Sequence, residues 1–311
     1  MNAVLRIRAA PYLLIGLVGA TIYFFFPAQL PLASRIATLA IFVMSLDLIV
    51  GYGGLATLGH SALYGTGAYT AGLLALHSSP NPLLGLLAGG AAGATVAALS
   101  GLFVLRYQGL TFLMLTIAVG QIIQNLASKF RTWTGGDDGL SGFTTGKILG
   151  LATFDLQGHV AFLYCTVVLL ICLWMMRRLM GSAFGLACIG IHQNRLRMAA
   201  LGTEIQPKLL TLYSLSGLFA GIAGALSAQV NQIVGLDTLG FELSAEALVM
   251  LVLGGAGSLL GAIAGTALFT TIHHVASNID PYHWLFVIGA MLVCGVLVPR
   301  ERWGALIRAR A

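Results

Sequence analysis

The chain consists of long apolar runs separated by short polar stretches. Ten such runs follow one another, longer and more uniformly apolar than the alternating segments of about ten residues expected of a membrane β-barrel. The predicted helical spans are 12–27, 36–52, 61–76, 83–105, 110–127, 160–174, 209–230, 243–253, 259–276 and 284–298. The third and eighth are short for a bilayer, which needs about 20 apolar residues, so we expect half-helices there.

Glycine and polar side chains interrupt the pattern at 51–69. Irregular backbone at membrane depth survives only where protein covers it or water reaches it, and broken helices mark transport sites in carriers. We therefore predict a break at Gly53 and Gly54, with Thr57, His60 and Tyr64 along a substrate pathway. The alternative is a tightly packed turn whose hydroxyl groups are satisfied internally.

A weaker version of this pattern recurs near the C-terminus. Gly254, Gly255 and Ser258 follow an apolar run and precede a small-residue helix, as 53–59 do. Paired interruptions in two halves point to a site between them, so these residues join the predicted pathway. Gly-Gly turns are also common in glycine-rich membrane proteins, which is the simpler explanation.

Asp47 lies within the second predicted span, shortly before the first glycine cluster. A carboxylate at membrane depth is costly unless it is paired or hydrated. It either accepts hydrogen bonds from the broken backbone or couples transport to an ion. With no intramembrane base nearby in sequence, we favour the structural role.

Small residues recur four apart in several spans. Such spacing lets helices approach closely, and packing within the chain is the expected result. The positions are Gly85, Gly89 and Gly93, then Gly217 and Gly221, then Gly261 and Gly265.

Composition supports an all-α, polytopic integral membrane bundle. Of the 311 residues, 58% are hydrophobic and 8% are charged, against roughly a quarter charged in soluble domains. The net charge of +6 comes from basic residues at span ends, so it does not indicate nucleic-acid binding. The four cysteines lack metal-ligand spacing, and we expect no bound metal.

The distribution of charge predicts the orientation. Basic residues gather at the N-terminus, at Arg106, in 177–208 and after position 298, and ten spans place all four groups on one side. The positive-inside bias makes that side cytoplasmic, with both termini there. The loop 128–159, whose charges cancel, is then periplasmic, and Arg35 is the single basic residue on that side.

The segment 181–202 is too polar to span the membrane. Ala187, Ile191, Arg195 and Met198 recur at helical spacing, which predicts a short amphipathic helix beneath the membrane. It is either a surface helix without a partner or a docking helix for a soluble protein.

The chain shows no means of binding ATP or of covalent chemistry. No phosphate-binding G-x-x-x-x-G-K-[ST] run is present, and no H-E-x-x-H motif occurs. We therefore predict a transport subunit rather than an enzyme, with no catalytic residues and no cofactor of its own.

Four stretches together resemble the permease subunits of branched-chain amino acid ABC transporters, specifically the LivM-type subunit. Residues 51–69 resemble that family's G-Y-x-G-L-x-S-L-G-H-x-A-F-x-G-x-G-A-Y, and 134–142 its T-G-G-x-x-G-L-x-G loop. Residues 185–202 resemble its G-x-A-x-x-A-I cytoplasmic segment, and 241–261 its F-x-x-S-x-E-x-L-x-M-x-x-L-G-G-x-G-S-x-x-G. The chain departs from the family at Gln121, where Glu is frequent, and in a coupling segment that lacks acids.

This resemblance implies a single permease domain, 1–311, in the bacterial inner membrane. Its partners would be a LivH-like second permease subunit, two ATPase subunits that hold ATP and magnesium, and a periplasmic binding protein facing Trp133 and Asp137. The segment 181–202 would be the coupling helix to the ATPases. The residues expected to carry the coupling are Gly185, Ile191, Arg195, Arg197, Ala199 and Gly202.

The resemblance implies import of branched-chain or hydrophobic amino acids, by alternating access driven by the ATPases. Relatives in the family also carry urea, amides or aromatic acids. An importer is not the only class the residues allow. Asp47 and His60 would serve a self-contained ion-coupled carrier, and a purely structural scaffold would need neither.

Overall fold

The computed structural model describes residues 2–146, 158–279 and 289, and helices joined by short connections make up these ranges. The predicted span 284–298 therefore lies almost entirely outside the described residues. The helices are α1 (Asn2–Phe25), α2 (Leu30–Asp47), α3 (His60–His77), α4 (Pro82–Val104), α5 (Leu110–Lys129), α6 (Arg131–Thr134), α7 (His159–Met180), α8 (Ala183–Gln193), α9 (Arg195–Ala200), α10 (Ile205–Asn231), α11 (Phe241–Gly254) and α12 (Leu259–Ile279).

Local sequence explains where several helices begin. Asn81 caps α4 by accepting from the Leu83 backbone N–H at 3.2 Å, and Pro82 occupies the first helical position, where its missing N–H costs nothing. Asn194 caps α9 in the same way, accepting from the Arg197 N–H at 2.9 Å. These caps satisfy backbone donors that would otherwise be unpaired.

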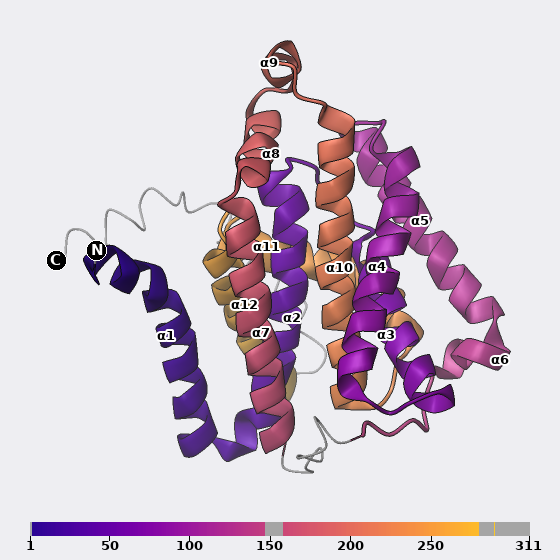
Figure 1. Ribbon diagram of the computed structural model, residues 1–311. Helices are drawn as coiled ribbons and strands as arrows, with labels where there is room; N and C mark the ends of the chain where they lie inside the picture. Colours follow the sequence, from indigo (N-terminus) through magenta and orange to yellow (C-terminus); the bar gives the residue numbers. More distant parts are fainter. Residues whose placement is uncertain (1, 147–157, 280–288, 290–311) are drawn as a thin grey trace.

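The centre of the bundle is formed by α2 and α10 (Figure 1). Within an apolar 18-residue stretch of each span, 78% of the residues are buried in 27–52 and 67% in 205–231, but only 22% in 110–129. Figure 1 shows α7 and α12 on one side of α2, α3 and α4 beyond α10 on the other, and α1 at the periphery. A helix that is apolar on all sides and buried belongs in the core, whereas α5 leaves most of its apolar surface uncovered by the rest of the chain.

Close glycine contacts hold α3, α4 and α10 together. A Cβ on Gly67 of α3 would overlap the backbone of Gly221 in α10, and one on Gly93 of α4 would overlap Gly217. Gly261 packs in the same way against Gly254, between α12 and α11. The predicted small-residue packing is confirmed, and it lies within the chain.

The helical membrane bundle is confirmed, but the count of ten spans is not supported. Among the described residues, six helices are long and apolar enough to cross a membrane by length and composition: 27–52, 82–104, 110–129, 159–180, 205–231 and 259–278. The predicted spans 61–76 and 243–253 are helices of 18 and 14 residues, α3 and α11. Polar residues in α3 and the short length of α11 account for the difference. Within the first predicted span, 12–27, the structure describes a shorter apolar helical stretch, 15–25, which is not one of these six.

The two ends of the bundle differ. One end carries α8 and α9, and the opposite end carries α6 (Figure 1). The α4–α5 connection lies at the α8–α9 end, because Gln206 Nε2 near the start of α10 donates to the Leu105 carbonyl at 3.3 Å. At the α6 end, the Gly146 N–H donates to the Pro80 carbonyl at 2.7 Å. We call these the coupling end and the outer end.

Candidate functional site

The break predicted after Asp47 is present. The last turn of α2 widens into a π-helical turn, Leu48–Tyr52, and residues 53–59 connect it to α3 without regular helix. Gly54 has φ +69°, a left-handed conformation that glycine adopts without strain. We call residues 53–59 the first break.

A second break, residues 255–258, separates α11 from α12 and meets the first. Gly255 and Gly257 have φ values of +94° and +82°. The Gly257 N–H donates to Asp47 Oδ1 at 2.6 Å, and a Cβ on Gly51 would overlap the Gly257 backbone. The two interruptions that resemble each other in sequence are therefore neighbours in space, joined by the one buried acid of α2.

A second link joins α3, which follows the first break, to α11, which precedes the second break. The Ser61 N–H in the first turn of α3 donates to Ser244 Oγ of α11 at 2.8 Å, and Ser244 Oγ donates to Ser61 Oγ at 2.8 Å. Both serines are buried. Sequence reasoning gave no role to Ser244, although it lies within the quoted 241–261 motif.

His60 lies in the core, where it joins three helices. Its Nε2 lies 2.9 Å from Ser45 Oγ of α2 and 3.4 Å from Ser216 Oγ of α10. Both serine hydroxyls donate to backbone carbonyls, those of Phe42 and Ser45, so Nε2 is the nitrogen that carries the proton. This geometry makes His60 a helix-joining residue in the described conformation.

Thr57 is likewise fully buried. Its hydroxyl oxygen accepts from the Gly59 N–H at 3.3 Å, within the first break. Thr57 and His60 therefore stabilise the break locally.

Tyr64 reaches a cavity. It lines a space of about 300 Å³ at the outer end, together with residues from α2, α10 and α11 and from the short turn Leu236–Leu239. The polar residues around it are Arg35, Thr38, Tyr64, Ser227, Asn231, Asp237 and Thr238. We call this space the outer cavity.

The outer cavity places a cation and an anion around one small volume. Arg35 and Asp237 are both exposed. Within residues 2–146 and 158–279 the one ion pair joins Arg131 and Asp137, at 2.9 Å, so Arg35 and Asp237 do not neutralise each other. Such an arrangement suits a solute that carries a carboxylate at one end and an ammonium at the other.

The predicted helix 181–202 is two helices. It ends at Gln193 and restarts at Arg195, because Asn194 is extended, with φ −159° and ψ 101°. The prediction of one continuous helix was wrong at this residue, and asparagine's preference for the cap position is the signal that it missed.

The structure separates the expected coupling residues into two groups. Gly185 and Ile191 are buried in α8, facing the bundle. Arg195 is half-buried, whereas Arg197, Ala199 and Gly202 are exposed beyond it. Two leucines between them are unusually exposed for apolar side chains, Leu196 at 85% and Leu201 at 73%.

α8 contacts the first break directly. His192 Nδ1 lies 3.0 Å from the Gly51 carbonyl oxygen, and a Cβ on Gly54 would overlap the His192 ring. His192 was not among the predicted site residues. The contacts continue from α8 through Gly51 and Asp47 to the second break.

The expected receptor-facing loop is described as far as residue 146. Trp133 is 66% exposed, and its ring stacks on that of His77 with centroids 6.4 Å apart. Asp137 accepts from both Arg131 and Ser128. Trp133 and Asp137 thus lie at the outer end, the same end as the outer cavity.

The chain is similar in sequence to several known proteins. The high-affinity branched-chain amino acid transport system permease protein LivM of Escherichia coli is 28% identical over 283 residues, and the match covers 83% of this chain and 65% of LivM. The galactofuranose transporter permease protein YtfT of Escherichia coli is 25% identical over 298 residues, covering 91% of this chain and 82% of YtfT.

A third relative is the galactose/methyl galactoside import permease protein MglC of Escherichia coli, 26% identical over 222 residues, covering 66% of this chain and 63% of MglC. The chain thus spans less than two thirds of the length of LivM, 65%. No solved structure matches it. The family model for the permease component of branched-chain amino acid transport systems matches residues 30–296. The chain therefore belongs to the branched-chain amino acid transport system permease family.

Proposed function

We propose that the chain is the permease subunit of an ATP-driven importer for branched-chain or other hydrophobic amino acids in the bacterial inner membrane. A second permease subunit completes the pathway, two ATPase subunits hydrolyse ATP, and a periplasmic binding protein delivers the substrate. The family match supports the permease role, and relatives described as importing sugars show that it does not decide the solute.

One observation favours an amino acid over a sugar, namely the opposite charges of Arg35 and Asp237 around the outer cavity. A zwitterion can pair with both charges, whereas an uncharged sugar or urea offers neither an ammonium nor a carboxylate to make these charge-assisted hydrogen bonds. In this proposal Arg35 meets the carboxylate and Asp237 the ammonium as the solute enters, with Tyr64 beyond them.

The proposed orientation places the outer end in the periplasm and the coupling end in the cytoplasm. Arg106 and the basic residues of 177–208 lie at the coupling end, as the positive-inside bias requires. Arg35, the exception at the outer end, is accounted for by its place in the cavity. Exposed Leu196 and Arg197 of α9, with Leu201 just after it, then offer a docking surface to an ATPase subunit.

The test is uptake by proteoliposomes that contain the chain with its ATPase, second permease and receptor. We expect uptake of radiolabelled leucine and none of galactose or urea. Arg35→Gln and Asp237→Asn should each lower leucine uptake about tenfold or more, because a charged hydrogen bond contributes about 1.5–3 kcal/mol and 1.4 kcal/mol is a factor of ten.

Lys129→Gln is the matched control, because Lys129 is an exposed basic residue at the outer end that does not line the cavity. Equal uptake by all three variants would contradict the role of the outer cavity. Uptake of galactose in place of leucine would contradict the proposed substrate class.

A further inference from the structure

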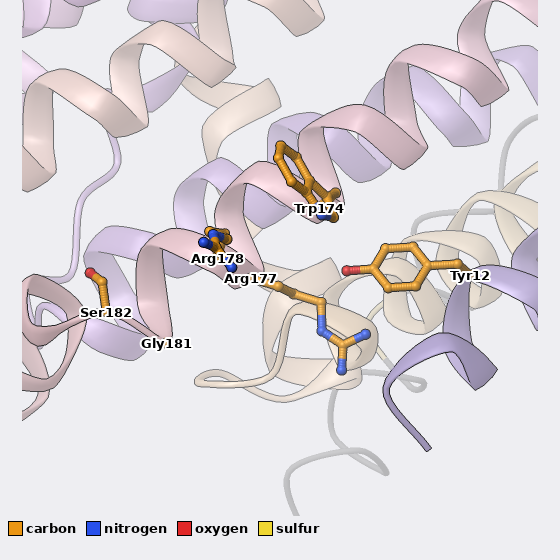
Figure 2. Close-up of a pocket in the computed structure, with 6 residues that line it drawn as sticks. All are labelled: Tyr12, Trp174, Arg177, Arg178, Gly181 and Ser182. Carbon is orange, nitrogen blue, oxygen red and sulfur yellow. The ribbon is translucent and has the colours of Figure 1, made fainter. Parts of the chain in front are cut away.

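A large cavity lies at the coupling end, between α1 and α7, away from the outer cavity. It has a volume of about 690 Å³ and is lined by Tyr12, Trp174, Arg177, Arg178, Gly181 and Ser182. Figure 2 shows the Tyr12 ring beside the Arg177 side chain, with Trp174 about one turn back along α7. We call this space the basic cavity.

Arg177 is incompletely satisfied. Its Cζ lies 5.4 Å from the centroid of the Tyr12 ring, a cation–π distance. Its Nη1 is buried and has no hydrogen-bond partner among the described residues. A buried donor of a charged group that finds no acceptor is destabilising, so an oxygen ligand at this nitrogen would be stabilising. Arg178, exposed beside it, adds a second positive charge.

The rest of the lining indicates where this cavity lies relative to the bilayer. Trp and Tyr are enriched at the membrane–water boundary, where an apolar ring and a polar tip are both accommodated. Trp174 and Tyr12 therefore place the basic cavity at headgroup depth. An anion at that depth is a phospholipid phosphate or a phosphate from solution, and both would satisfy the two guanidinium groups.

The neighbouring cavities distinguish these two sources. A second space of about 350 Å³ shares Arg177 and Gly181 with the basic cavity, and is also lined by Leu260. A third space of about 460 Å³ shares Leu260 with the second, and its lining is almost wholly apolar. This apolar groove is bounded by α1, α2, α7 and α12, with Ile15 at one end of its α1 wall and Ile22 at the other.

The three spaces thus adjoin one another through shared lining residues, from a basic pocket at one end to an apolar groove at the other. The α1 wall runs from Tyr12 through Ile15 to Ile22, and ten residues of helix are about 15 Å long. A ligand with a phosphate at one end and a hydrocarbon chain at the other would match the basic pocket and the apolar groove in turn. Free phosphate would use the pocket and leave the groove empty.

We propose that this surface binds one anionic phospholipid, with its phosphate on Arg177 and Arg178 and an acyl chain in the apolar groove. The second space also contacts Tyr52, Gly257 and Ser258. The lipid would therefore lie beside the second break, and its presence would stabilise that break against rearrangement.

The test is lipid binding by the full-length purified chain, measured by native mass spectrometry after delipidation. Phosphatidylglycerol is the anionic probe, phosphatidylcholine the zwitterionic lipid, and inorganic phosphate the solution anion. We expect phosphatidylglycerol to bind best, Arg177→Gln to weaken it about tenfold, and phosphate not to displace it. Arg106→Gln, an exposed arginine at the same end, is the control.

The groove is tested separately. A Cβ on Gly19 would contact Phe162 and Thr166, which line the groove, at 3.7 Å, whereas one on Gly16 meets nothing within 4 Å. Gly19→Leu should therefore fill the groove and weaken phosphatidylglycerol binding several-fold, and Gly16→Leu should not. Both retain Arg177, so they remain informative if Arg177→Gln fails to fold.

Three results would overturn the proposal. Equal retention of phosphatidylglycerol by Arg177→Gln and Arg106→Gln would exclude the guanidinium contact. Displacement by inorganic phosphate would indicate a solution anion. A Gly19→Leu variant with unchanged binding would exclude the groove. None of these measurements depends on which solute is imported. A failure of the lipid proposal would therefore not contradict the proposed transport function, which the uptake experiment tests separately.

Discussion

Asp47 is the residue on which the two breaks depend most directly. It is buried, and its Oδ1 accepts from the Gly257 N–H across the contact. The sequence places an acid beside a glycine cluster, which is enough to suggest a structural role. It cannot show that the donor belongs to the second cluster, because that contact joins positions far apart in the chain.

Substitution of Asp47 separates the structural role from ion coupling. Asp47→Asn keeps an oxygen that can accept from the Gly257 N–H, whereas Asp47→Ala removes this acceptor and the link that it makes between α2 and the second break. We expect the alanine variant to lower the thermal unfolding temperature of the purified chain clearly, and the asparagine variant to keep most of its stability and uptake. An asparagine variant that is stable but cannot transport would instead indicate a titrating acid.

Gly54 is required for two reasons. Its φ of +69° is unfavourable for residues with a Cβ, and that Cβ would overlap the His192 ring. Gly54→Val should therefore lower transport strongly while the protein still inserts, because the change distorts the contact between α8 and the first break rather than a span. The measurement is uptake per inserted molecule, with Gly16→Val as control. A variant that inserts poorly but transports normally per molecule would favour a packing role.

At the scale of elements, periodicity and caps identify most helices but not how each one is divided. The prediction 36–52 corresponds to α2 and its π-helical turn, and 209–230 lies within α10. The segment 181–202 was assigned one helix because its apolar spacing runs through Asn194, where the backbone is extended. A single capping residue thus outweighs a weak periodic pattern in a short segment.

The division between α8 and α9 allows us to propose a separate coupling role for each helix. α8 is anchored by buried Ile191 and by the contact of His192 with Gly51, while α9 projects beyond it (Figure 1), with Leu196 and Arg197 exposed. In the proposed importer, α9 would be the surface offered to an ATPase, and α8 the part that moves the first break.

Charge reversal on α9 tests this division. Replacing both Arg195 and Arg197 with Glu should uncouple ATP hydrolysis from transport, because a docking face with the wrong charge binds its partner poorly. We expect the substrate stimulation of ATPase activity in the reconstituted complex to be lost. Arg106→Glu, at the same end but outside α9, should retain it. Unchanged stimulation in the double variant would contradict docking through α9.

At the scale of the whole molecule, the outer cavity could not be predicted from the sequence. In the sequence, Arg35 is only an exception to the charge distribution, and no pattern marks Asp237 as a site residue. They come together because α2 and the turn Leu236–Leu239 meet at the outer end. Such a site depends on packing between distant segments, whereas the breaks depend on local glycine content and were predictable.

Relative movement of the two breaks is expected during transport, and it can be blocked. Tyr52 and Ser258 line the same 350 Å³ space, one beside each break. A Tyr52→Cys/Ser258→Cys variant treated with a short bifunctional maleimide should lose uptake, while each single variant should keep it. Native Cys165, Cys172 and Cys188 are buried, and burial raises the pKa of the Cys188 thiol to about 11, which keeps its reactive thiolate scarce. Full uptake after cross-linking would show that the breaks need not separate.

The glycine contacts among α3, α4 and α10 limit which residues can change when a related protein acquires a different solute. Where two backbones touch, as at Gly67 and Gly221, any larger residue on one helix must be matched by a shift of the other, so single substitutions are poorly tolerated. Most of the side chains around the outer cavity lie outside these contacts, on α2, α11 and the turn between α10 and α11, and are free to vary one at a time. New solutes are therefore expected to arise by changes at positions such as Arg35 and Asp237, with the three-helix block inherited unchanged.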